Sequence, residues 1–210
     1  MLTQEQKNQF SEILEHLGKT LDITKEQHEA AVKSYRYVGD WLADSSSPLT
    51  RYAPEILPQG SFLIGTMTRP ILENDELDID LVCKFEGKPT SWTQYDLKKA
   101  VGDRLKANGI LEKLLVIPDR RRCWKLKYTD AAKFHMDVVP SIVSIGFHSI
   151  LNKAFSEQYL RDPAALAIRI TDNQESNYRS STNPDEWILS GPFGYGLWFE
   201  QCATIQLKVL

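Results

Sequence analysis

Residues 77–83 read Leu-Asp-Ile-Asp-Leu-Val-Cys, so that apolar and acidic side chains alternate over the first five positions. Strict alternation is typical of a β-strand with one buried face. Asp78 and Asp80 then share the opposite face, roughly 6.5–7 Å apart. Two carboxylates on one strand face repel each other unless a divalent cation lies between them. Magnesium, which takes oxygen ligands from carboxylates and phosphates, suits such a pair.

A third acid, Asp137, lies in a second apolar run at residues 134–140. Alternation places Asp137 and His135 on one face of this run. Residues 122–128 also alternate, and the short polar turn that follows predicts an antiparallel hairpin. If the hairpin packs beside the first strand, three carboxylates converge, as in two-metal sites for phosphoryl or nucleotidyl transfer. Taken alone, such acids more often mark a solvated sheet edge or a surface ion pair.

A glycine-serine turn precedes both acidic strands, with Ser61 17 residues before Asp78. Glycine lets the backbone approach a phosphate closely, and neighbouring amide groups form anion-binding nests. The hydroxyl of Ser61 adds a donor. An isolated Gly60-Ser61 pair indicates no more than a turn, but its combination with the acids favours a phosphate-binding turn.

The composition of the 210-residue chain, 42% apolar and 25% charged, is typical of a soluble globular protein. No run of about 18 apolar residues is present, so we expect no membrane association. The formal net charge of -3 argues against stable binding to duplex nucleic acid. Three widely spaced cysteines indicate neither a disulfide framework nor a zinc site, and we expect a cytoplasmic protein.

Helical spacing of apolar residues is found in four ranges, 4–17, 24–44, 92–115 and 193–210. We therefore expect an α+β fold, in which a twisted mixed sheet carries the acids on one face and residues 4–44 pack behind it. Residues 1–150 form the core in this prediction. Residues 151–210 begin a C-terminal helical lobe, which we expect to be truncated because the last helix pattern has no cap.

Several of these motifs together resemble a known family. The sequence resembles the polymerase-β-like nucleotidyltransferases. More narrowly, it resembles the bacterial cGAS/DncV-like nucleotidyltransferases (CD-NTases) of anti-phage signalling. The motifs that carry the resemblance are Gln59-Gly60-Ser61, Gly65-Thr66, Arg69-Pro70, Asp78–Cys83 and Asp137–Pro140. The resemblance is close over residues 55–145 and looser over 168–171 and 187–199. Residues 190–195 lack the Asn-Pro-type turn common in relatives, which leaves the nucleobase pocket unassigned.

The resemblance implies specific roles for six residues. Gly60 and Ser61 would hold the β- and γ-phosphates of a nucleoside triphosphate, and Gln59 would support their turn. Two Mg²⁺ ions, for which Mn²⁺ can substitute, would be bound by Asp78 and Asp80. The second ion would also be bound by Asp137, which would help to deprotonate the incoming hydroxyl group.

The implied activity is a magnesium-dependent nucleotidyltransferase. It would join nucleoside triphosphates, ATP, GTP or both, into a cyclic di- or trinucleotide for antiviral defence and release pyrophosphate. Its product would act on a cyclic-nucleotide-sensing effector protein. Two alternatives stay open, namely transfer to an RNA end or a protein hydroxyl, and a non-catalytic nucleotide-binding relative. The intact acids disfavour the last.

A basic patch lies between the two acidic regions of the sequence. It comprises Arg120, Arg121, Arg122, Lys125 and Lys127. The patch either steers triphosphates toward the acids or is a solvated turn and strand face, and the sequence favours neither.

Overall fold

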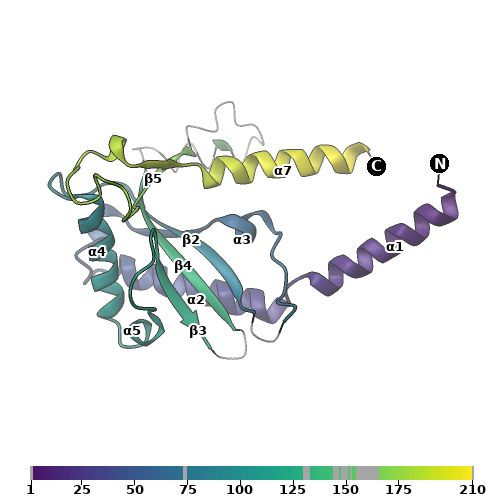
Figure 1. Ribbon diagram of the computed structural model, residues 1–210, viewed down its shortest axis with the longest axis horizontal. Helices are drawn as coiled ribbons and strands as arrows, with labels where there is room; N and C mark the ends of the chain where they lie inside the picture. The colour runs from purple at the N-terminus through teal and green to yellow at the C-terminus, as the bar shows by residue number, and fades with distance from the viewer. Residues whose placement is uncertain are drawn as a thin grey trace.

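The computed structural model describes residues 2–72, 75–129, 133–143, 147, 151, 153–154 and 166–209, with side chains described up to residue 204. A six-stranded mixed sheet lies at its centre (Figure 1). The strands are β1 (Glu55–Pro58), β2 (Leu77–Phe85), β3 (Trp124–Tyr128), β4 (Phe134–Ile142), β5 (Ile168–Ile170) and β6 (Ile188–Ser190). The order β1-β2-β4-β5-β6 forms the main path, and β3 pairs with β4.

Strands β2 and β4 are parallel neighbours, and their register fixes the centre of the molecule. Asp78 lies opposite His135, and Asp80 lies opposite Asp137. Strand β3 pairs antiparallel with β4 and places Lys125 opposite Asp137. The predicted hairpin is therefore confirmed, although residues 130–132 of its turn lie outside the described residues.

Strands β3 and β5 share one edge of β4. Strand β3 covers the first part of β4, and β5 pairs with Ser141 and Ile142 near its end. Both run antiparallel to β4, so the chain leaving β5 heads toward the chain that enters β3. The segments before Trp124 and after Ile170 consequently meet beside Pro140, whose carbonyl accepts a hydrogen bond from the amide of Thr171.

The helices begin where the sequence provides caps. Thr3, Thr24 and Thr93 each close a capping box at the start of a helix. The helical elements are α1 (Gln4–Leu21), α2 (Lys25–Ala43), η1 (Thr50–Tyr52), α3 (Gly60–Ile64), α4 (Gln94–Lys106), α5 (Leu111–Leu114), η3 (Pro184–Glu186) and α7 (Pro192–Val209). The range expected as one helix at 92–115 is thus two helices, because Asn108-Gly109 interrupts it. No helix among the described residues has the length and apolar character to cross a membrane.

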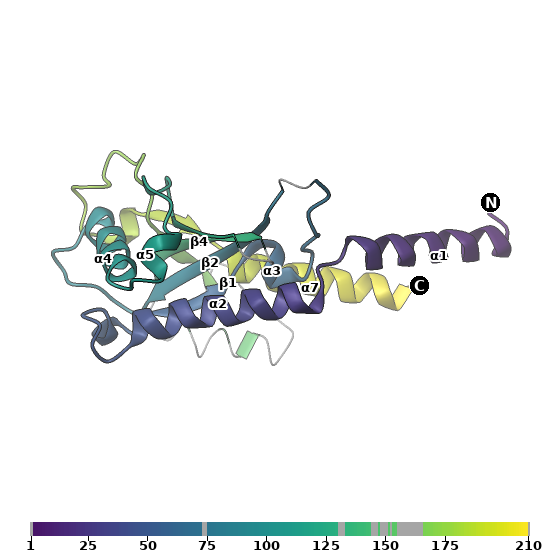
Figure 2. The same ribbon diagram turned by 90° about the horizontal axis from the view of Figure 1, so that it is seen from below.

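Apolar cores lie on both faces of the sheet. Helices α2 and α4 pack on one face, where Ile79, Leu81 and Met136 are fully buried. On the other face, Val82 and Val139 contact a second cluster that includes Phe193 and Leu197 of α7. Figures 1 and 2 show α2 running along one face of the sheet and α7 lying over the other.

The expectation that residues 4–44 pack behind the sheet is correct for α2 and wrong for α1. Helix α1 buries none of its residues and projects away from the sheet (Figure 2). Phe10, Ile13 and Leu14 of its apolar stripe are each more than half exposed. An amphipathic pattern therefore predicted the helix correctly but not what the helix packs against.

The fold class is α+β with a mixed sheet, as predicted. Helices were expected behind one face of the sheet, where α2 and α4 lie, and α7 from the expected C-terminal lobe covers the other face. Within residues 151–210, the described part adds two short strands to the sheet and the long helix α7. The proposed domain boundary at residue 150 stays a prediction.

Candidate active site

Adjacent strands bring the three predicted acids together on one face of the sheet. Asp78 and Asp80 alternate with Leu77, Ile79 and Leu81, which are buried on the opposite face. Asp137 lies directly across from Asp80 on β4. The side chain of Asp78 is 58% exposed and that of Asp137 is 21% exposed. The acids thus lie at the boundary between the sheet and solvent, where a substrate has access.

His135 contacts the first acid through its ring. His135 Nε2 lies 2.8 Å from Asp78 Oδ1, and Nδ1 lies 3.5 Å from Glu76 Oε2. Lys127 Nζ pairs with the same glutamate at 2.6 Å. The hydrogen bond from His135 lowers the pKa of Asp78, against the opposing effect of burial, and the same bond raises the pKa of His135.

Burial and like charges affect the second acid, Asp80, and a lysine neighbours the third, Asp137. Burial, together with the charges of Asp78 and Asp137, raises the pKa of Asp80 to about 6. Lys125 Nζ lies 3.2 Å from Asp137 Oδ1, yet this buried oxygen has no hydrogen bond of good geometry among the described residues. Neighbouring carboxylates that suppress one another's ionisation are stabilised by a cation.

The donor set of this site fits a divalent metal ion. One ligand atom from each of Asp78, His135 and Asp137 lies within 4.8 Å of the other two, and Asp80 neighbours them on β2. Carboxylate oxygens suit hard cations such as Mg²⁺ and Mn²⁺. The raised pKa of Asp80, which burial and the charges of Asp78 and Asp137 cause, indicates that a cation would stabilise this cluster.

The predicted glycine-serine turn lies against the second acid. The amide of Gln59 donates to the carbonyl of Asp80 over 2.9 Å, which ties the turn to β2. Gly60 then opens α3 with φ +59°, and a Cβ atom there would lie 2.7 Å from Asp80 Oδ2. Only glycine fits this position without moving the acid, because both the backbone angle and the space exclude a side chain.

A pocket of about 710 Å³ opens beside the site. Of the six predicted residues, Ser61 and Asp78 line it, next to His135 and Lys127. The remaining lining comes from Leu77 at the start of β2 and from the segment between α3 and β2, namely Thr66, Met67, Thr68, Arg69, Pro70, Ile71, Asp75 and Glu76. The pocket therefore adjoins the exposed acid and the serine of the turn, as a site for an anionic substrate requires.

Sequence reasoning located the acids but missed their partners. Alternation put His135 on the face of Asp137, yet its hydrogen bond is to Asp78 on the neighbouring strand. Glu76, which contacts both His135 and Lys127, was not singled out. These contacts depend on the pairing of β2 with β4, and no signal within either strand specifies that pairing.

The part of the sequence that contains the candidate site is similar to known proteins. Residues 54–140 match the sequence model of the nucleotidyltransferase domain of cyclic GMP-AMP synthase DncV-like proteins. That range contains all six predicted site residues. A c-di-GMP synthase of Roseivirga ehrenbergii is 26% identical over 211 residues, which cover 100% of this chain and 48% of that protein.

Solved structures show the same fold. The CD-NTase CdnG of Bradyrhizobium diazoefficiens, in complex with GTP, superposes with a TM-score of 0.60 at 21% identity, covering 85% of this chain and 42% of CdnG. DncV of Vibrio cholerae, a cyclic AMP-GMP synthase, gives 0.58 at 16% identity, covering 88% and 58%. The chain thus spans about half the length of the relatives it matches.

Proposed function

This chain is a member of the bacterial CD-NTases, the DncV-like nucleotidyltransferases, and we propose that it supplies the catalytic core of a cyclic oligonucleotide synthase. The reaction would join nucleoside triphosphates into a cyclic di- or trinucleotide and release pyrophosphate at each bond. GTP is the favoured substrate, because the curated relative is a c-di-GMP synthase and the CdnG structure holds GTP. ATP is the second candidate, since one DncV complex contains both nucleotides.

The observation that carries this proposal is the meeting of three acids and one glycine turn. Asp80 and Asp137 lie opposite each other on the parallel strands β2 and β4, and Asp78 is two residues before Asp80 on β2. The backbone of Gly60 packs against Asp80. A carboxylate cluster beside a phosphate-accepting turn is the arrangement that nucleotidyl transfer needs.

Each residue then has a defined task. Gly60 and Ser61 would bind the β- and γ-phosphates, with Gln59 fixing the turn to β2 through its amide. Asp78, Asp80 and Asp137 would hold two divalent ions, with Mg²⁺ as the ion that fits best and Mn²⁺ as a substitute. Bound ions would neutralise the triphosphate and stabilise the charge that develops on the leaving pyrophosphate.

Proton transfer falls to Asp137, the acid of β4. As the incoming 2′- or 3′-hydroxyl oxygen bonds to the α-phosphorus, its proton would pass to this carboxylate and the bond to pyrophosphate would break. Positioning of the two reactants would supply much of the remaining acceleration. We further propose that the product signals to an effector protein in defence against phage.

Product formation tests the proposal directly. The protein, in the longest form that its gene encodes, is incubated with labelled ATP, GTP, CTP and UTP and either Mg²⁺ or Mn²⁺. With the label on the α-phosphate, phosphatase removes it from unreacted triphosphates but not from phosphodiester bonds, so a surviving labelled species contains joined nucleotides. Its mass shows whether it is cyclic, because a ring has as many phosphates as nucleosides and a dephosphorylated linear product has one phosphate fewer. We expect a phosphatase-resistant product that requires the divalent ion and contains guanine.

Paired acid variants make the test specific. Asp78→Asn/Asp80→Asn should abolish the product, whereas Asp103→Asn, an exposed acid paired with Lys99 on α4, should leave it unchanged. A resistant product that persists in the double variant would refute the assignment of the acids. A labelled RNA or protein in place of a cyclic product would refute the proposed acceptor.

A further inference from the structure

Two arginines of the basic patch are held by a single buried acid. Arg121 Nε lies 2.8 Å from Asp172 Oδ1, and Arg122 Nε lies 2.8 Å from Asp172 Oδ2. The Asp172 side chain is fully buried, whereas the two arginine side chains are 47% and 46% exposed. A buried carboxylate with no partners costs several kcal/mol, and these two arginines offset that cost.

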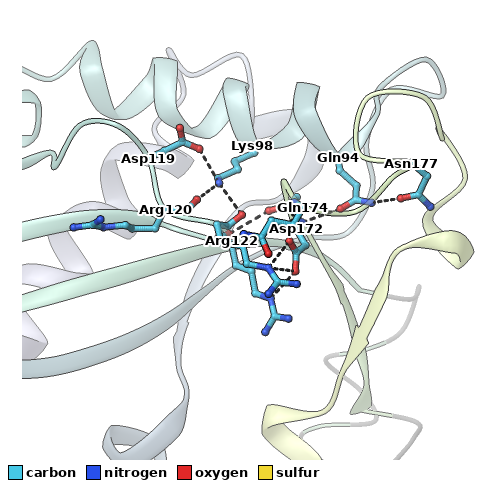
Figure 3. A network of polar contacts seen from close by, with 10 residues as sticks. Gln94, Lys98, Asp119, Arg120, Arg122, Asp172, Gln174 and Asn177 are labelled. Carbon is cyan, nitrogen blue, oxygen red and sulfur yellow. Dashed lines mark hydrogen bonds and ion pairs between the residues drawn. The ribbon is translucent and has the colours of Figure 1, made fainter.

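The backbone that carries the arginines is also fixed. Lys98, of which 1% is exposed, donates to the carbonyl oxygens of Arg120 and Arg121 and pairs with Asp119 at 2.7 Å (Figure 3). The amide of Asn173 donates to the Arg121 carbonyl over 3.0 Å. The loop before β3 is therefore held from α4 on one side and from the segment after β5 on the other.

Asp172 is itself locked in place by further hydrogen bonds. Its amide donates to Gln94 Oε1 over 2.8 Å, and its Oδ1 accepts from the amide of Gln174 over 3.0 Å. Gln94, which is fully buried, donates in turn to Asn177 (Figure 3). The acid that orients both arginines thus has little freedom to move.

The geometry of the ion pairs leaves strong donors available. Both arginines contact Asp172 through Nε, and their terminal nitrogens have no hydrogen-bond acceptor in the part of the chain that the structure describes. Two guanidinium groups against one carboxylate carry a net charge of +1. Guanidinium groups bind phosphate oxygens with two parallel hydrogen bonds, which distinguishes them from the point charge of lysine.

We propose that Arg121 and Arg122, oriented by Asp172, form a binding site for the phosphate groups of a ligand, separate from the metal-binding acids. The register supports the separation. Lys125 lies opposite Asp137, whereas β3 begins only at Trp124, so Arg121 and Arg122 lie in the loop before the strand, beyond the register pairs of β3 with β4. The ligand is a polyphosphate, such as the phosphate tail of a nucleotide that does not react at the acids. The site does not require the chain to be an active synthase.

Arg120 provides a matched control within the same loop. Its side chain points away from Asp172 (Figure 3), so it shares the charge and the neighbourhood but not the orientation. Replacing arginine by lysine keeps the net charge and still allows an ion pair with Asp172. A comparison of Arg121→Lys/Arg122→Lys with Arg120→Lys therefore separates oriented guanidinium groups from a general positive field.

Calorimetric titration in EDTA, with inorganic tripolyphosphate as the probe, measures this binding without metal or turnover. We expect saturable binding to the unaltered protein and at least about tenfold weaker binding to Arg121→Lys/Arg122→Lys. Binding to Arg120→Lys should change by less than about threefold. Thermal unfolding of each variant checks that the fold persists.

Three results would overturn the site. They are no binding to the unaltered protein, equal binding to the double variant, and equal losses in the double variant and Arg120→Lys. A loss in Ser61→Ala as large as that in the double variant would also overturn it, because the probe would then occupy the glycine-serine turn. Failure of cyclic product formation would leave this test unaffected, so the two proposals fail separately.

Discussion

Gly60 shows how much a single residue determines at the candidate site. A Cβ atom at Gly60 would lie 2.7 Å from Asp80 Oδ2, and the backbone angle is left-handed. Gly65, at the other end of α3, has a similar φ of +67° but nothing within 4 Å of a Cβ. A side chain at either glycine would therefore be strained by the left-handed backbone angle, but only a side chain at Gly60 would also collide with an acid.

We expect Gly60→Ala to lower nucleotidyl transfer by about 100-fold, because the added methyl group would lie too close to Asp80 Oδ2 and must displace this carboxylate from its position. Gly65→Ala should cost roughly 1 kcal/mol of stability from its backbone angle and leave activity nearly intact. Product formation and thermal unfolding of both variants give the comparison. Equal activity losses would show that backbone strain, not displacement of Asp80, is responsible.

Asp172 affects a different property, the dependence of the protein's stability on pH. Burial opposes its ionisation, but the hydrogen bonds from Arg121 and Arg122 outweigh that effect and lower the pKa of Asp172 to about 2. An acid whose pKa falls on folding stabilises the protein above its unfolded pKa of about 4 and loses that contribution as the pH drops toward 2.

Asp172→Asn should therefore lower the free energy of unfolding by roughly 2 kcal/mol near pH 6, and the difference from the unaltered protein should shrink below pH 4. Asp185→Asn, in which the replaced acid is 86% exposed, is the control and should show no such trend. Denaturant unfolding across this pH range measures both. Parallel curves for Asp172→Asn and the unaltered protein would contradict the assigned pKa.

At the scale of elements, local patterns predicted which segments form strands and helices, but not how they pair. Alternation gave β2, β3 and β4, and the capping box at Thr24 gave the start of α2. Strands β5 and β6 have three residues each, too few for a periodic signal. Arg121 and Asp172 are 51 positions apart in the sequence and lie in two different loops. They meet because β3 and β5 pair with the same edge of β4, which sequence patterns do not reveal.

The packing of α4 on β3 depends on one glycine in the helix. A Cβ atom at Gly102 would lie 2.0 Å from the Trp124 ring, whereas one at Gly18 in α1 would meet nothing within 4 Å. Gly102→Ala should therefore destabilise the fold by about 1–3 kcal/mol, as overpacked cores do.

Gly18→Ala is the matched change in a helix that buries no residue. It should not destabilise the fold, and it should raise helix content slightly, because alanine favours helices over glycine by about 1 kcal/mol. Thermal unfolding and circular dichroism compare the two variants. A destabilised Gly18→Ala protein would show that α1 packs on something in solution.

At the scale of the whole molecule, the sheet has an excess of negative charge on the face of the candidate site. The core residues of β2 and β4 fix three carboxylates close together, and the pKa of Asp80 rises to about 6 as a result. Folding thus works against the ionised form of Asp80 when no cation is present. If the acids bind a cation as proposed, its binding and the stability of the fold are coupled by mass action, because only the folded sheet brings these carboxylates together.

Asp80→Asn should for this reason stabilise the metal-free protein, by up to roughly 2 kcal/mol near pH 7, since it removes one of three mutually repelling charges. The same change should remove most of the stabilisation that Mn²⁺ gives to the unaltered protein. Thermal unfolding in EDTA and in millimolar Mn²⁺ measures both effects, with Asp103→Asn as the control that changes neither. If Asp80→Asn lowers the stability of the metal-free protein, the acids are held by internal hydrogen bonds, and the site needs no cation to balance it. If it raises the stability and loses the response to Mn²⁺, the sheet maintains an electrostatic strain that a divalent ion relieves.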